Sequence, residues 1–192
     1  MNEIMLIDNV DSFIYNLAEQ LRSLDNKVLI YRNSVYVDSI IKAISKMHNP
    51  ILVLSPGPGK PSDAGCMSML LKKLKGKLPI IGICLGYQAI VESYGGITKN
   101  AKEIIHGRAS LISHDKKEMF EKIPNPLLVA RYHSLICDKV PESLTINSYF
   151  EDIIMSVRNN SDKVCGFQFH PESILTPFGS QLLEETIIWT RN

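Results

Sequence analysis

The chain has 192 residues, of which 45% are hydrophobic and 21% are charged, and its formal net charge is +1. This composition is that of an ordinary globular protein, and the small net charge gives no electrostatic basis for binding nucleic acid or an anionic membrane. No apolar run approaches the roughly 18 residues of a membrane span, and the N-terminus lacks the basic region of a signal peptide. The sequence therefore predicts a cytoplasmic protein with no nucleic-acid or membrane partner.

The cysteines are widely spaced and include no Cys-x-x-Cys pair. Free thiols in a reducing compartment fit this spacing better than a disulfide framework or a zinc site does. We therefore expect no metal on this chain. The four cysteines are Cys66, Cys84, Cys137 and Cys165.

In chain order, the first half alternates short apolar runs with segments whose apolar residues recur at helical spacing. Strands that alternate with helices imply parallel pairing, so the sequence predicts an α/β fold with an open, mostly parallel twisted sheet flanked by helices. Asp11 or Ser12 is expected to cap the first helix. The expected strands are residues 4–7, 28–31, 51–54 and 79–83, and the expected helices are residues 13–24, 37–47, 67–74 and 87–92.

The pattern changes after the Gly95-Gly96 pair, where short alternating runs are separated by Pro, Asn and Asp turns. Such runs predict a small antiparallel addition to the sheet, followed by one closing helix. With no linker or internal repeat, residues 1–192 are expected to form a single domain. The expected strands are short ones within 97–112 and then 127–132, 144–149, 153–158 and 164–169, and the helix is 179–189.

The stretch from residue 79 to residue 88 predicts a nucleophile elbow. A buried strand leads into Cys84, which has Gly82 two residues before it and Gly86 two residues after it, and a helix follows. A sharp turn from strand to helix forces close approaches that side chains would obstruct. The start of a helix also favours a thiolate over a thiol. Cys84 is therefore the candidate nucleophile, and a small buried core residue is the alternative.

A Pro-Gly-Pro-Gly loop follows the strand at residues 51–54. It can be a rigid turn, or a backbone wall whose N–H groups face a ligand with no side chain in the way. The carboxyl ends of parallel strands share one edge of the sheet, so this loop and Cys84 are expected to open on the same side.

His170-Pro171-Glu172 supplies a candidate base and its partner. In an extended segment, residues two apart project to the same side, and Pro171 is expected to keep the segment extended. An imidazole can take the thiol proton, and a carboxylate on its far nitrogen fixes its tautomer. His133 is the rival base, but no carboxylate lies two residues beyond it, so we expect it in the pocket wall.

These motifs, in this order, resemble the class I (triad) glutamine amidotransferases, whose fold is flavodoxin-like. The resemblance implies that Cys84 attacks the side-chain amide of glutamine, with His170 as acid and base and Glu172 as its orienter. It also implies a glutamyl thioester and no cofactor on this chain. The implied oxyanion hole is the backbone N–H groups of Gly57 and Leu85, and the implied glutamine-binding residues are Gly57, Pro58, Gly59, Gln88, Ser134 and Leu135.

Further motifs at residues 7–13, 131–135 and 167–175 resemble the small subunits that serve chorismate-using synthases. The closing stretch is most similar to the branch that serves anthranilate synthase. This resemblance implies a chorismate-binding large subunit (component I) as partner, and ammonia as the product passed to it. The subunit for 4-amino-4-deoxychorismate synthesis, or one subunit shared by both pathways, is the alternative. Two positions depart from the family pattern: Tyr87 stands where His is usual, and Val10 where Tyr is common.

Two further interpretations stay open at this stage. A stand-alone cysteine hydrolase acting on γ-glutamyl peptides could share the elbow and the histidine. A degenerate binding module that only scaffolds the partner could share the fold, although the intact Cys84, His170 and Glu172 argue against it.

Overall fold

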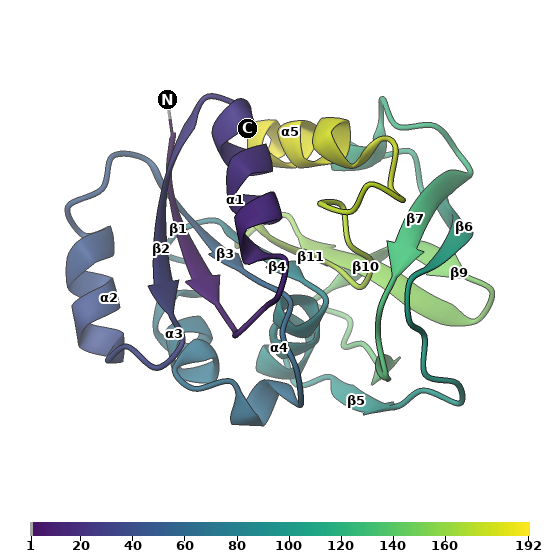
Figure 1. Cartoon of the computed structure of the whole chain (residues 1–192), viewed down its shortest axis with the longest axis horizontal. Helices are drawn as coiled ribbons and strands as arrows, with labels where there is room; N and C mark the ends of the chain where they lie inside the picture. Colours follow the sequence, from purple (N-terminus) through teal and green to yellow (C-terminus); the bar gives the residue numbers. More distant parts are fainter. Residues whose placement is uncertain (1) are drawn as a thin grey trace.

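The computed structural model describes residues 2–192, and within them one mixed sheet of nine strands runs through the molecule (Figure 1). Five neighbouring strands of this sheet are parallel, and the other four continue it in antiparallel pairing. The parallel strands are β2 (Asn26–Arg32), β1 (Asn2–Asp8), β3 (Pro50–Leu54), β4 (Ile80–Ile83) and β11 (Val164–Phe167). The antiparallel strands are β10 (Ile153–Asn159), β9 (Thr145–Phe150), β6 (Arg108–His114) and β7 (Leu127–Arg131).

Helices cover both faces of the parallel strands (Figure 1). Alternate residues of β1 enter opposite cores: Ile4 and Leu6 pack with one set of helices, and Met5 and Ile7 with the other. This alternation is the period of two expected for a strand buried on both faces. One face carries α1 (Ile14–Ser23), α5 (Gly179–Trp189) and the short helix η2 (Glu118–Phe120). The other face carries α2 (Val37–Ile44), α3 (Met67–Leu74) and α4 (Leu85–Ser93), with the short helix η1 (Pro61–Asp63) beside α3 and α4.

A separate antiparallel pair lies beside α4 (Figure 1). It joins β5 (Ile97–Asn100) to β8 (Leu135–Lys139). The sequence did not predict β8, because the strand has only five residues and two of them, Asp138 and Lys139, are charged and exposed. Pairing with β5 fixes the position of the preceding residue, Ser134, whose carbonyl oxygen accepts the Ala101 N–H (2.8 Å).

The predicted fold class is confirmed: an open α/β sheet is flanked by helices and carries an antiparallel addition. The prediction of a side-chain cap on the first helix is wrong, since Phe13 occupies the cap position and no side chain caps α1 within residues 2–192. The helix expected to reach residue 47 ends at Ile44. Every helix in the same residues is too short or too polar to cross a membrane.

Candidate active site

Cys84 lies at the junction of β4 and α4, where the chain turns sharply from strand to helix. Its backbone has φ 51° and ψ −99°, a conformation that residues other than glycine rarely adopt. Such residues persist where the surrounding structure holds them, and the serine nucleophile of many hydrolases sits on a turn of this kind. Cys84 directly precedes the first helical residue, so it stands at the positive end of α4.

Gly82 and Gly86 allow this turn because neither position has room for a side chain. A Cβ on Gly82 would lie 2.5 Å from the carbonyl carbon and oxygen of Gly86, and a Cβ on Gly86 would lie 2.4 Å from the carbonyl oxygen of Leu54. Backbone atoms of packed strands and helices move less easily than the end of a flexible side chain. The prediction that both positions require glycine is confirmed.

His170 and Glu172 form a buried pair in the loop after β11. Nδ1 of His170 lies 2.6 Å from Oε1 of Glu172, and their side chains are 9% and 3% exposed. The predicted extended conformation is wrong, because the Ser173 N–H donates to the His170 carbonyl oxygen (3.2 Å) and closes a turn with Pro171 in second place. A single antiparallel bridge to Ala130 anchors His170 to the end of β7.

The charge state of His170 is set by opposing effects. Burial has the largest single influence and lowers its pKa, but the charge of Glu172 and the proximity of Cys84 together raise the pKa well above its ordinary value. Glu172 occupies Nδ1, so Nε2 is the nitrogen left for proton exchange. This Nε2 makes no hydrogen bond of standard geometry with any described residue. The Cys84 sulfur, for its part, lies 3.7 Å from the carbonyl oxygen of Tyr132.

Two cavities meet at Cys84. The larger, of about 500 Å³, is lined by His170 and Glu172 and is here called the histidine cavity. The smaller, of about 320 Å³, is bounded by the Pro-Gly-Pro-Gly loop and is here called the loop cavity. The two share Gly57, Pro58, Cys84, His106 and Tyr132. A bound molecule in either cavity can therefore reach the sulfur.

The loop cavity brings together every residue that the sequence resemblance implied for binding glutamine. Gly57, Pro58 and Gly59 come from the loop after β3, and Gln88 comes from α4. Gln88 is buried, and its Nε2 donates to the Leu135 carbonyl oxygen (3.3 Å), so Oε1 is the atom left to accept from a ligand. Ser134 and Leu135 complete the set.

The implied oxyanion donors also lie at this junction. Leu85 is the first residue of α4, and the first N–H groups of a helix have no partner within it. Gly57 packs so closely that a Cβ there would lie 2.4 Å from the carbonyl oxygen of Asn9 and 3.1 Å from the Leu85 side chain. Gly57 therefore packs against the Leu85 side chain, and both residues line the loop cavity.

His133 lies in the wall of the loop cavity. Its Nε2 accepts from Nε of Arg131 (3.3 Å), so its Nδ1 carries the proton and donates to the Leu135 carbonyl oxygen (3.1 Å). Burial lowers the pKa of His133 to about 4, and the charge of Arg131 adds to this effect. A neutral imidazole with both nitrogens engaged orients the Ser134–Leu135 backbone.

Comparison with known proteins gives the family. The model of the family described as glutamine amidotransferase class-I matches residues 5–189. This chain belongs to the class-I glutamine amidotransferase family. It is 65% identical, over 98% of this chain and 94% of the relative, to a protein named anthranilate synthase component 2 from Buchnera aphidicola subsp. Acyrthosiphon pisum. A protein of the same name from Vibrio parahaemolyticus is 53% identical, over 98% of this chain and 96% of the relative.

The fold of this glutamine amidotransferase is also that of a solved structure. The crystal structure of a glutamine amidotransferase from Thermotoga maritima covers 100% of this chain, and this chain covers 99% of it. The TM-score is 0.80 at 15% sequence identity. At that identity the likeness concerns the fold alone.

Sequence reasoning missed several residues at the centre of this amidotransferase site. Tyr132 packs its ring edge-on against His170, with 5.2 Å between ring centroids, and its carbonyl oxygen faces the sulfur. Gln168 places Nε2 3.6 Å from the Cys84 sulfur. Both residues lie within the motifs at residues 131–135 and 167–175, but nothing in the sequence indicated that either would contact the sulfur. Tyr87, the departure from the family pattern, is fully buried and donates to the Ile154 carbonyl oxygen (3.1 Å) in the core.

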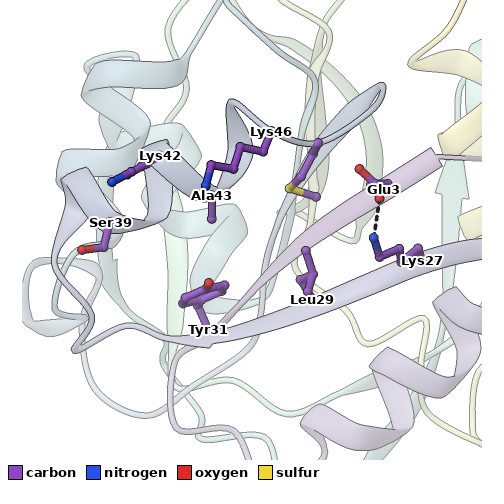
Figure 2. A pocket seen from close by; sticks show the side chains of 9 residues that line it. Glu3, Lys27, Leu29, Tyr31, Ser39, Lys42, Ala43 and Lys46 are labelled. Carbon is purple, nitrogen blue, oxygen red and sulfur yellow. Dashed lines mark hydrogen bonds and ion pairs between the residues drawn. The ribbon is translucent and has the colours of Figure 1, made fainter.

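A further cavity lies between β2, the edge strand of the sheet, and the segment that contains α2 (Figure 2). Its volume is about 400 Å³, and the ion pair between Lys27 and Glu3 (2.7 Å) lies at its rim. Both residues stand at the amino ends of their strands. The cavity shares no lining residue with the two cavities at Cys84, so it is a poor candidate for the amidotransferase chemistry.

Proposed function

We propose that this chain is the glutaminase subunit of an anthranilate synthase, and that residues 1–192 act as one glutamine amidotransferase domain. The observation that carries the proposal is the convergence of the Cys84 elbow and the buried His170–Glu172 pair on one cavity. The names of the relatives at 65% and 53% identity support the anthranilate branch.

In the proposed reaction, the Cys84 sulfur attacks the side-chain amide carbon of L-glutamine. His170 takes the thiol proton and gives it to the leaving nitrogen, so ammonia departs and a glutamyl thioester remains. Water, deprotonated by His170, then cleaves the thioester and releases glutamate. The N–H groups of Gly57 and Leu85 stabilise the oxyanion in both steps. Thiol, imidazole and water supply all the chemistry, so no cofactor on this chain is required.

The proposed partner is a chorismate-binding large subunit that consumes the ammonia. Apolar side chains stand exposed at the mouth of the histidine cavity, which is what a docking surface around an ammonia exit needs. They are Val10, Phe13 and Ile174, exposed by 54%, 54% and 95%. Docking is expected to align the site and raise its activity, because ammonia released without a partner is lost to water.

The test is glutamine hydrolysis by the purified chain, alone and with the large subunit, followed by product analysis with chorismate. We expect hydrolysis to rise when the partner is added and anthranilate to accumulate. Formation of 4-amino-4-deoxychorismate instead would assign the chain to the other branch. Cys84→Ser should lower hydrolysis by on the order of 10³-fold or more, while an unchanged rate in that variant would overturn the mechanism.

A further inference from the structure

Gln168 lies beneath the nucleophile, at the end of β11. Its side chain is fully buried, and its backbone N–H donates to the Met155 carbonyl oxygen (2.8 Å), which fixes the main chain. Side-chain Nε2 lies 3.6 Å from the Cys84 sulfur, and Oε1 lies 3.2 Å from Nε2 of Gln88. One amide thus bridges the nucleophile and a residue of the loop cavity.

The orientation of this amide follows from a backbone carbonyl group. The Leu135 carbonyl oxygen can only accept, so the atom of Gln88 that faces it at 3.3 Å must be the NH₂ nitrogen. That nitrogen also faces Gln168, whose nearer atom must therefore be its oxygen. The NH₂ group of Gln168 is then the end that points at the sulfur. A donor held in this way needs no reorientation when charge develops on the sulfur.

We propose that Gln168 is a further catalytic residue: its amide N–H stabilises the Cys84 sulfur as a thiolate and links the sulfur, through Gln88, to the loop cavity. A thiol can donate to the Tyr132 carbonyl oxygen, whereas a thiolate needs donors, and Gln168 provides one in a site largely closed to water. The role in glutamine hydrolysis rests on the proposed function, but the contact with the sulfur does not.

The contacts from Gln88 through Gln168 to the Cys84 sulfur couple glutamine binding in the loop cavity to the sulfur. Gln88 holds Gln168 by its NH₂ group and leaves Oε1 for a ligand in the loop cavity. A ligand that donates a hydrogen bond to Oε1 of Gln88 shifts this side chain. The Gln168 side chain then moves with it, because its Oε1 accepts a hydrogen bond from Nε2 of Gln88. The other titratable side chains around the two cavities at Cys84 are Asp11, His106, Tyr132, His133, His170 and Glu172.

The experiment measures the rate at which iodoacetamide alkylates Cys84 across pH, with peptide mapping to count Cys84 alone. Gln168→Met keeps the length and burial of the side chain but removes the donor. We expect the pH midpoint of alkylation to rise by about one unit, the shift given by loss of one hydrogen bond to a charged group. Gln181→Met, on the surface side of α5, is the matched control and should leave the midpoint unchanged. Equal midpoints in Gln168→Met and the unsubstituted protein would overturn the proposal.

Cys165 reports whether the variant is folded, because it is fully buried and labels only on unfolding. If iodoacetamide labels Cys165 in Gln168→Met, that variant is unfolded and a second variant tests the proposal. Gln88→Met leaves the donor in place but removes the group that orients it, so a smaller rise of the midpoint supports the proposal and no rise refutes it.

The assay also separates this proposal from the proposed function, because iodoacetamide needs no glutamine. A raised midpoint in Gln168→Met would support the contact, while a lack of glutamine hydrolysis by the unsubstituted protein, even with the large subunit present, would reject the glutaminase function. Glutamine hydrolysis by the unsubstituted protein, together with an unchanged midpoint in Gln168→Met, would support the glutaminase function and reject the role of Gln168.

Discussion

Nδ1 of His170 lies 2.6 Å from Oε1 of Glu172, and the carboxylate is 3% exposed. At this burial the carboxylate holds one tautomer of the imidazole and stabilises its protonated form. The pair is therefore arranged to keep Nε2 available on the side of the histidine cavity.

Replacing Glu172 by Gln tests this arrangement. The amide keeps the shape but removes the charge that helps to raise the pKa of His170, so that pKa should fall. We expect kcat for glutamine hydrolysis to drop by on the order of 10² to 10⁴-fold, with a smaller change in KM. Glu142→Gln, an exposed carboxylate, is the control. A variant that keeps full activity would show that Glu172 does not assist the histidine.

Gly86→Ala should damage the elbow itself. The new methyl group would lie 2.4 Å from the carbonyl oxygen of Leu54, so α4 has to move away from β3. We expect a loss of about 1–3 kcal/mol in the free energy of unfolding, measured in urea, together with loss of hydrolysis. Ser93→Ala near the end of the same helix should cost about 1 kcal/mol or less, as expected for one partly buried hydrogen bond within the helix. Equal effects of the two substitutions would contradict the steric argument.

His133 should make the fold sensitive to acid. Its pKa is about 4 in the fold against 6.5 in the unfolded chain, so between these values the unfolded chain binds a proton that the fold does not. Stability is therefore complete above pH 6.5 and is lost as the pH falls towards 4. From pH 7 to pH 5 the loss is about 2 kcal/mol.

His133→Asn removes this titration and leaves the other ionisable groups in place. The free energy of unfolding of the variant should fall by about 2 kcal/mol less than that of the unsubstituted protein between pH 7 and pH 5. Parallel pH profiles for the two proteins would mean that His133 has the same pKa in the fold as in the unfolded chain.

Ile174→Asp should weaken association with the large subunit. The side chain is 95% exposed at the mouth of the histidine cavity, and a charge there opposes an apolar contact. We expect the dissociation constant, measured by calorimetry, to rise at least about tenfold. Ile188→Asp, near the other end of α5 and 44% exposed, should have little effect. If Ile188→Asp weakened association and Ile174→Asp did not, the docking surface would lie near the C-terminal end of α5 rather than at the histidine cavity.

Most of the fold could be predicted from the sequence, and the residues predicted for the site line the two cavities at Cys84. The predictions that failed did so for physical reasons. Apolar runs and their periodicity predicted α3 and α5 to the residue, because their buried faces repeat without interruption. The turn at Pro171 was predicted as extended, since the proline ring allows both conformations and a backbone bond from Ser173 decides between them. Gln168 could not be predicted, because its role depends on two partners that lie 80 and 84 residues away in the chain.

The meeting of the two cavities at Cys84 bears on the order in which products depart. In the proposed reaction, the glutamyl group attached to the Cys84 sulfur would lie in the loop cavity, so ammonia could leave through the histidine cavity before water arrives. We therefore expect ping-pong kinetics, in which the nitrogenous product is the first to be released and glutamate the second.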